Sequence, residues 1–195
     1  LIEESDKNKE RDLLMSYMGR TTMMSTARSL LRLSHEQEKP DAERERGYQE
    51  RDLKGYEQSM ASINSRYVAD IDKALLKHFL AKYVDLPKGQ RIATFDKFFE
   101  IKDKDLTKAT AKIDKMYANT KLGDLDTRLA MMAMSEKQLR ASDDPFIQYA
   151  VSQFDYSMEE EKLSKTLSGK LQQVRPEYMK ALIAFKKSRS EAVYA

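Results

Sequence analysis

The two histidines, His35 and His78, are the residues whose neighbours could support metal or acid–base chemistry. His35 is followed by Glu36, which invites comparison with the helical zinc motif His-Glu-x-x-His. Lys39 occupies the fifth position of that motif, where its charge would repel a metal, and Pro40 ends the helix there. Because there are two histidines in all and no EF-hand loop pattern, the sequence predicts no metal site.

His78 lies at helical spacing from Ile71 and Leu75. We therefore expect it to be a hydrogen-bonded histidine in the core or at its boundary. A general base would also need a nucleophile or an orienting carboxylate close by. Asp72 is near in sequence but lies too far round the helix to serve.

The serines, glycines and paired carboxylates lack the spacings that catalysis requires. No Gly-x-Ser-x-Gly occurs, no serine precedes a lysine by three positions, and the few glycines are scattered. Asp124 with Asp126, and Asp143 with Asp144, are better explained as helix caps than as acid–base pairs. We predict no catalytic residue, no cofactor-binding residue and no cofactor in this chain.

Two apolar clusters have both a core and a binding interpretation. They are Met131, Met132 and Met134, and Phe95, Phe98 and Phe99. Methionine lines adaptable peptide-binding surfaces but fills irregular cores more often. The phenylalanines could instead dock on a part of a larger protein. The core interpretation is favoured for both clusters.

Composition determines the fold class. Of 195 residues, 41% are hydrophobic and 34% are charged, which excludes a disordered tail. Only 6 Gly and 4 Pro punctuate a chain rich in good helix formers. The sequence predicts an all-α fold, a multi-helix bundle or array that forms one domain over residues 1–195.

The apolar spacing predicts where the first helices lie. We expect one helix over residues 2–38 that kinks at Gly19 and ends before Pro40. Its buried face should comprise Leu13, Tyr17, Met24, Ala27 and Leu31. A second helix should begin after Gly47 and pack through a seam of Leu53, Tyr56, Met60, Ile63 and Tyr67.

Caps and prolines predict the later boundaries. Asp70 should cap a helix over residues 71–83, and a turn should follow over residues 85–89. Asp105 and Asp124 should each open a helix, and Asp144 with Pro145 should open another. The last helical region, about residues 158–187, should kink or break briefly at Pro176.

Charge and targeting signals exclude several classes of partner. The 35 basic and 32 acidic residues give a net charge of +3 and are interleaved, which disfavours nucleic-acid binding. Residues 43–51 are best explained as a solvated charged face. No apolar run is long enough to span a membrane, no cysteine can form a disulfide, and no signal peptide is present. Because the chain begins with Leu1, we expect a piece of a larger protein.

Several stretches, taken in order, carry a family resemblance. Residues 27–53 come first, followed by Tyr83-Val-Asp-Leu-Pro-Lys-Gly-Gln-Arg91, then Tyr117-Ala-Asn-Thr-Lys-Leu-Gly-Asp124 with Arg128. Next come Ser142-Asp-Asp-Pro-Phe146, Arg175-Pro-Glu-Tyr-Met-Lys-Ala-Leu182 and Ala192-Val-Tyr194. In order and spacing they resemble the helical domain of the bacterial dipeptidyl-peptidases of serine peptidase family forty-six.

The resemblance implies a function for the whole parent protein. Such enzymes carry a His/Asp/Ser triad on a chymotrypsin-like double β-barrel and remove dipeptides from free N-termini, in the periplasm or at the bacterial cell surface, usually as homodimers. Their helical domain covers the active-site cleft and limits access to chain ends. No triad position has a counterpart here, and the asparagine that helps bind the substrate amine would precede Leu1.

The resemblance therefore implies a helical lid whose partners are the β-barrel domain of its own chain and, in the whole enzyme, peptide substrates. It implies no nucleic acid and no membrane as partners. The alternative from the residues alone is a stand-alone all-α module that binds a partner helix through its seams. A third interpretation, nucleic-acid binding, predicts an affinity that falls steeply with salt.

Overall fold

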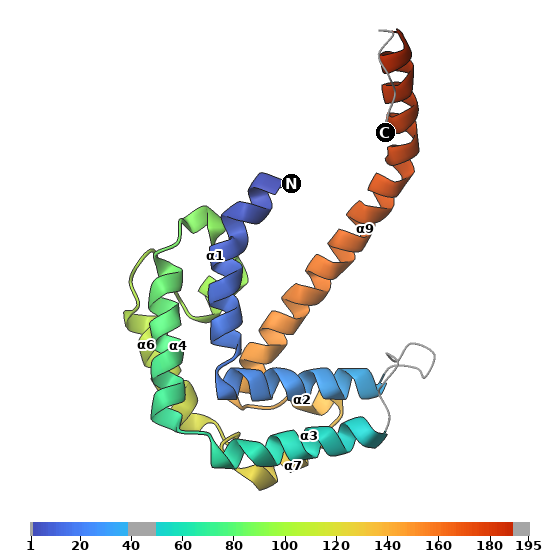
Figure 1. Cartoon of the computed structure of the whole chain (residues 1–195). Helices are drawn as coiled ribbons and strands as arrows, with labels where there is room; N and C mark the ends of the chain where they lie inside the picture. The colour runs from blue at the N-terminus through green and yellow to red at the C-terminus, as the bar shows by residue number, and fades with distance from the viewer. Residues whose placement is uncertain (1, 39–49, 189–195) are drawn as a thin grey trace. The chain divides into compact units, whose positions relative to one another are not determined.

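The computed structural model describes residues 2–38 and 50–188, with some side chains next to the gaps and within the last helix left outside the description. The elements in chain order (Figure 1) are α1 (Ile2–Gly19), α2 (Thr22–Glu38), α3 (Glu50–Ser62), η1 (Ile63–Ser65), α4 (Ala69–Val84), η2 (Lys88–Gln90), α5 (Ala93–Phe98), α6 (Thr107–Asn119), α7 (Leu125–Met132), α8 (Glu136–Arg140) and α9 (Pro145–Ser188). These ranges contain no β-strand, so the predicted all-α class is confirmed. The charged face predicted at residues 43–51 lies outside the described side chains.

The chain divides into two units, residues 1–154 and residues 155–195, and α9 belongs to both. The first unit holds the short helices and the core, and the second holds the rest of α9. The prediction of one domain concerns both units together and stays a prediction. Within the described residues, no helix is long and apolar enough to cross a membrane.

In the first unit, α4 lies beside α1 and also packs on α6, while α2 and α3 both contact α7 (Figure 1). The core combines methionines of α1 and α2 with a ring cluster around α5. Centroids of Tyr83 and Phe95 lie 4.7 Å apart, and those of Phe95 and Phe99 lie 4.8 Å apart. The core interpretation of the phenylalanines is confirmed, since Phe95 and Phe99 are buried and Phe98 packs against them. Met131 and Met132 are buried as well.

The predicted kink at Gly19 is a complete break between α1 and α2. The hydroxyl of Thr21 donates to Met18 O at 2.7 Å, which ends α1. The carboxylate of Asp72 then accepts the backbone N–H of Thr22 at 2.5 Å and that of Met23 at 3.1 Å. These are the first N–H groups of α2, which have no partner within their own helix. A cap from a residue 50 positions away therefore starts α2 in a new direction.

The break also corrects the predicted buried face. Met24, Ala27 and Leu31 of α2 are buried as predicted, but Leu13 is 52% exposed and Tyr17 is 38% exposed. The prediction extended one helical period across positions 20 and 21, and a break resets that period. The buried residues of α1 lie one position further on, at Leu14 and Met18.

The predicted seam of the next helix is confirmed, but the cap after it is wrong. Met60 and Ile63 are buried, and the other seam residues pack against the core. The N-cap of α4 is Val68, which makes no side-chain cap. Because α4 begins earlier than predicted, Asp70 lies in its first turn and pairs with Lys73 at 3.3 Å. A carboxylate there still favours the helix N-terminus.

Later boundaries follow the local cap signals. Asp124 accepts the N–H of Thr127 at 2.8 Å, and Asp105 accepts that of Thr107 at 2.9 Å. Asp144 accepts the N–H of Phe146 at 3.0 Å. All three predicted helix starts are confirmed.

Of the two alternatives predicted at Pro176, the short break is wrong, and the kink within the helix stays a prediction. α9 is continuous from Pro145 to Ser188, with Pro176 inside it. A proline removes one intrahelical hydrogen bond and crowds the preceding turn, but long helical segments on both sides can hold it in place. The same continuity joins the two helical segments that the sequence predicted separately over this region.

Asp72→Asn should destabilise the chain by about 3 kcal/mol, because the amide places a donor where N–H and O–H groups already point. The measurement is the free energy of unfolding in urea. Asp70→Asn is the matched control, because the side chain of Asp70 is 90% exposed. This substitution should change the free energy of unfolding by less than about 0.5 kcal/mol. Equal effects of the two substitutions would contradict the role of Asp72 as a cap.

Candidate functional site

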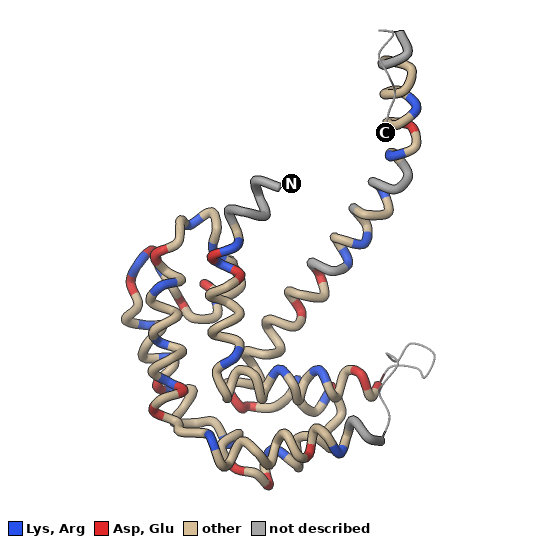
Figure 2. The backbone as a smooth tube through the Cα atoms, in the orientation of Figure 1, with Lys and Arg blue, Asp and Glu red and all other residues tan. Residues whose placement is uncertain are grey.

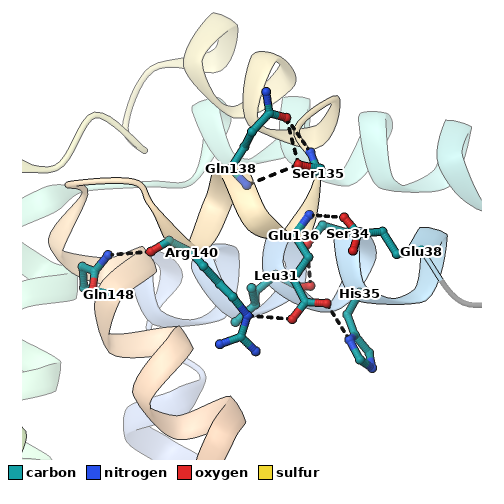
Figure 3. A network of polar contacts seen from close by, with 9 residues as sticks. All are labelled: Leu31, Ser34, His35, Glu38, Ser135, Glu136, Gln138, Arg140 and Gln148. Carbon is teal, nitrogen blue, oxygen red and sulfur yellow. Dashed lines mark hydrogen bonds and ion pairs between the residues drawn. The ribbon is translucent and has the colours of Figure 1, made fainter.

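The end of α2 and the short helix α8 are joined by a network of polar side chains (Figure 3). His35 Nδ1 lies 2.7 Å from Glu136 Oε2, and both side chains are mostly buried, at 23% and 15% exposure. The other oxygen of Glu136 accepts Arg140 Nε at 2.7 Å. One carboxylate therefore bridges a histidine of α2 and an arginine of its own helix.

The backbone N–H groups at the N-terminus of α8 have hydrogen-bond partners among other side chains of this network. Ser135 and Gln138 form a capping box, in which Ser135 Oγ accepts the N–H of Gln138 at 3.2 Å and Gln138 Oε1 accepts that of Ser135 at 2.9 Å. Glu38 accepts the N–H of Glu136 at 2.6 Å (Figure 3). A five-residue helix has few hydrogen bonds of its own, so these side chains stabilise it.

The network also contacts the first turns of α9. The ring of His35 meets that of Phe154 edge-on at 4.9 Å, and the guanidinium of Arg140 lies 5.8 Å from the same ring. Gln148 Nε2 donates to Arg140 O at 3.3 Å (Figure 3). α2, α8 and the start of α9 are thus held by one set of contacts, which we call the His35 clamp: His35, Glu136, Arg140 and Phe154.

The electrostatics of the clamp favour an ionised glutamate. Burial alone would raise the pKa of Glu136, but hydrogen bonds from His35 and Arg140 and the charge of both outweigh it. The pKa of Glu136 is lowered as a result. Charge-assisted bonds of this kind are roughly twice as strong as neutral ones.

A histidine paired with a carboxylate is the orienting half of a nucleophile-activating arrangement. A nucleophile is absent from the clamp. Ser34, the neighbouring hydroxyl, is buried and donates to Leu31 O at 2.8 Å (Figure 3). The arrangement fixes three helices in place and has no group that could attack a substrate.

His78 does not occupy the position that the sequence predicted. It is exposed, with Ile71 at 60% and Leu75 at 44% exposure on the same face. Its ring meets Phe79 edge-on at 5.3 Å. The expectation of a core or boundary histidine is wrong, because helical spacing shows which residues share a face but not whether another helix covers it.

Asp72 is a second polar centre, buried between α2, α4 and α6. Besides the two backbone N–H groups of α2, it accepts the hydroxyl of Tyr117 at 2.8 Å. Burial and the charge of Asp72 raise the pKa of Tyr117, and the same two causes raise that of Tyr67 to about 12. Tyr117 is thus held as a protonated donor to Asp72.

Arg128 is a fully buried cation. It donates its hydrogen bonds to carbonyl oxygens and not to a carboxylate. It donates to Leu122 O at 2.7 Å and to Met60 O at 3.0 Å, and it also bonds the side chain of Asn64. Burial lowers its pKa. It ties α7 to the loop before it and to the end of α3.

A cavity of about 560 Å³ lies beside η2 and α5, lined in part by Arg91 and Asp96. Arg91 Nε is 3.3 Å from Asp96 Oδ2 without hydrogen-bond geometry, and Arg91 Nη1 donates to Asp103 O at 2.7 Å. Burial raises the pKa of Asp96, and Arg91 opposes that rise. A groove of about 650 Å³ between α3 and α7 is mainly apolar, with Glu57 as its acidic residue.

Across the described residues, no group of three or more His, Cys, Asp or Glu side chains could hold a metal ion. Asp124 and Asp144 are N-caps, and Asp144 also accepts the hydroxyl of Thr120 at 2.8 Å and the N–H of Lys121 at 3.0 Å.

Glu136 and Arg140, the residues that matter most in the clamp, went unrecognised in the sequence. His35 and Glu136 are 101 positions apart, so no local pattern links them. The spacing of Ser135 and Gln138 is a local signal that could have predicted the start of α8, but not the partner of Glu136.

Comparison with known proteins identifies the family. A model of the family described as Peptidase S46 matches residues 1–195. The chain belongs to the Peptidase S46 family. It is 41% identical over 194 residues to the Asp/Glu-specific dipeptidyl-peptidase of Shewanella putrefaciens, a match that covers 100% of this chain and 26% of that protein. This Peptidase S46 chain thus spans about a quarter of the length of the curated relative it matches, and the predicted family is confirmed.

Glu136→Gln should lower the free energy of unfolding by about 2 kcal/mol at pH 7, because the charge-assisted bonds from His35 and Arg140 are lost. A lowered folded-state pKa stabilises the fold above the ordinary value of 4.5, and this contribution is lost as pH falls through the folded pKa. The difference between native protein and variant should therefore be full above about pH 5 and shrink below it.

The measurement is urea unfolding at a series of pH values. Glu159→Gln, an exposed substitution of the same kind, is the control and should have no pH-dependent effect. A native-minus-variant difference that stayed constant from neutral pH into the acid range would contradict an ionised clamp.

Proposed function

We propose that this chain is the helical lid of a serine-type dipeptidyl-peptidase and covers an active-site cleft that another part of the longer protein supplies. The observation that carries the proposal is the match of this all-helical chain, over its full length, to about a quarter of a dipeptidyl-peptidase. The described clusters support it, because each holds helices together and none combines a nucleophile with a base.

The first unit has the properties of a rigid cover. Its helix ends are closed by long-range side-chain contacts, such as Asp72 on α2 and Glu38 on α8. A stiff cover over a cleft excludes water and orients the substrate, and its motion can gate turnover. The chemistry itself belongs to a His/Asp/Ser triad outside this chain.

The proposal includes the setting of the whole enzyme. Its substrates are peptides with a free N-terminus, from which it releases dipeptides. The lid's partner is the β-barrel domain of its own chain, the enzyme is a homodimer, and it acts in the periplasm or at the bacterial cell surface. The release of dipeptides rests on family membership and on the name of the relative. The β-barrel partner, the homodimer and the compartment rest on the family resemblance alone.

A division of labour between lid and barrel can be tested with fluorogenic dipeptidyl substrates. The substrates form a panel in which the second residue of the dipeptide is acidic or apolar. The longer protein should release the fluorophore from at least one of them. The 195-residue chain alone should not, even at high concentration. Release by the chain alone, or none by the longer protein on any substrate, would overturn the proposal.

Gating can be tested by a reversible tether in the longer protein. This chain has no cysteine of its own, so a cysteine introduced into the lid has no competitor there. A second cysteine is placed in the barrel, and any native cysteine of the barrel is first replaced by serine. With the disulfide formed, kcat/KM should fall by about tenfold or more, and a reductant should restore it. Single-cysteine variants are the control, and unchanged turnover of the tethered enzyme would exclude gating.

A further inference from the structure

The cavity beside η2 and α5 has charges of both signs in its lining. Its cations are Lys88, Arg91 and Lys102, and its acids are Asp96 and Asp103. All of them belong to the first unit. The volume of about 560 Å³ lies within the roughly 300–1,000 Å³ of small-molecule sites, whereas one water takes up about 30 Å³. The cavity therefore has room for a small organic ligand.

Hydrogen bonds to the backbone hold the walls of this cavity in place. Arg91 Nη1 donates to Asp103 O at 2.7 Å, and the N–H of Ile101 donates to Asp96 O at 2.9 Å. Acidic and basic positions follow one another along residues 85–105, which include the whole lining (Figure 2). The cavity is thus formed before any ligand enters, and its charges come from one stretch of chain.

The ion pair at the cavity lacks hydrogen bonds on both sides. The side chain of Arg91 is 3% exposed and that of Asp96 is 18% exposed. Among the described residues, neither Arg91 Nε nor Asp96 Oδ1 has a hydrogen-bond partner, although both atoms are buried. Buried polar atoms are almost always hydrogen-bonded. The carboxylate of Asp96 therefore lacks a donor that its surroundings do not supply.

Asp96 is able to accept a hydrogen bond from the cavity that it lines. Oδ1 is covered, but the terminal torsion of an aspartate is broad, so a turn of the carboxylate presents an oxygen to the cavity. Burial raises the pKa of Asp96 by more than Arg91, Tyr83 and Lys88 lower it. A cationic donor at this oxygen would restore the stabilisation of the charged form that burial removes.

The rim of the cavity favours a negative group. Lys88 Nζ lies 3.5 Å from Asp103 Oδ1, and because both side chains are at least 80% exposed, this pair is weak. Lys102 is exposed as well. Three cations against two acids leave an excess of positive charge, which attracts a carboxylate. A ligand that satisfies both the rim and Asp96 carries a carboxylate and an ammonium.

Other occupants fit less well. Across the described residues, no group of three or more His, Cys, Asp or Glu could hold a metal ion, and the cations of this lining would repel one. A plain anion such as phosphate would leave Asp96 without its donor. A single amino acid would leave most of the volume to water, whereas a dipeptide fills more of it and has the same two charged ends.

We propose that this cavity binds a dipeptide with both ends free. The ammonium binds Asp96, the carboxylate lies between Lys88 and Lys102, and a side chain packs on Ile101. The need for a zwitterion comes from the cavity, but the choice of a dipeptide also rests on the proposed function, since dipeptides are what that enzyme releases. Binding to this chain requires no peptidase activity, so failure of one proposal leaves the other standing.

The test is an NMR titration of the isotope-labelled chain with Ala-Ala, N-acetyl-Ala-Ala and Ala-Ala amide. Ala-Ala should bind with a Kd of about 1 mM or below and shift the backbone amides of residues 88–103. Each blocked analogue should bind at least about tenfold more weakly, because it lacks one charged end. Equal binding of either analogue, no binding, shifts confined to other residues, or tighter binding of alanine or inorganic phosphate would overturn the proposal.

Two acidic residues provide a matched pair of variants. Asp96→Asn should weaken binding of Ala-Ala by about tenfold or more and leave the weak binding of N-acetyl-Ala-Ala unchanged, since that analogue has no ammonium. Glu100→Gln removes an exposed acid that follows α5 but does not line the cavity, and should change binding by less than about threefold. The NMR spectra show that both variants are folded, and equal losses would refute the role of Asp96.

The cations of the rim have a matched pair of their own. Lys88→Gln with Lys102→Gln should weaken binding of Ala-Ala by about tenfold and leave that of Ala-Ala amide unchanged. Lys97→Gln with Lys108→Gln removes two exposed cations outside the lining and should have less than about a threefold effect. A similar loss in both double variants, or an equal loss for Ala-Ala and its amide, would contradict a carboxylate at the rim.

Discussion

One buried carboxylate determines how the first unit is built. Asp72 of α4 accepts the first N–H groups of α2 and the hydroxyl of Tyr117 from α6, so three segments far apart in the sequence meet at one ion. A buried charge is tolerated only where donors replace the water it has lost. The break after α1, the direction of α2 and the position of α6 all follow from satisfying that charge.

At the other end of α2 a buried charge again has hydrogen-bond partners in place of water. Glu38 and His35 bring their side chains to α8, where Glu136 accepts hydrogen bonds from two directions and keeps its charge. Arg128 follows the same rule with the opposite sign, since carbonyl oxygens replace the water that this buried cation has lost. Polar groups at helix ends, rather than the apolar core alone, specify how these short helices are arranged.

The sequence predicts what is local and misses what is not. Asp124 and Asp144 cap their own helices within three residues, so their roles could be read directly. Asp72 caps a helix 50 positions away, and nothing near Thr22 indicates that α2 starts there. Apolar spacing likewise found the face of α4 that bears Ile71 and Leu75, but could not say that this chain leaves it exposed. Which partner a face or a carboxylate meets is decided by packing.

Three residues in the stretches that carry the family resemblance have clear structural roles. Tyr83 accepts the N–H of Ile92 at 2.6 Å, Arg128 is a buried tie, and Asp144 caps α9. A catalytic domain would be recognised by its nucleophile and base. In this segment the three residues hold helices and loops together, as expected if its contribution is shape.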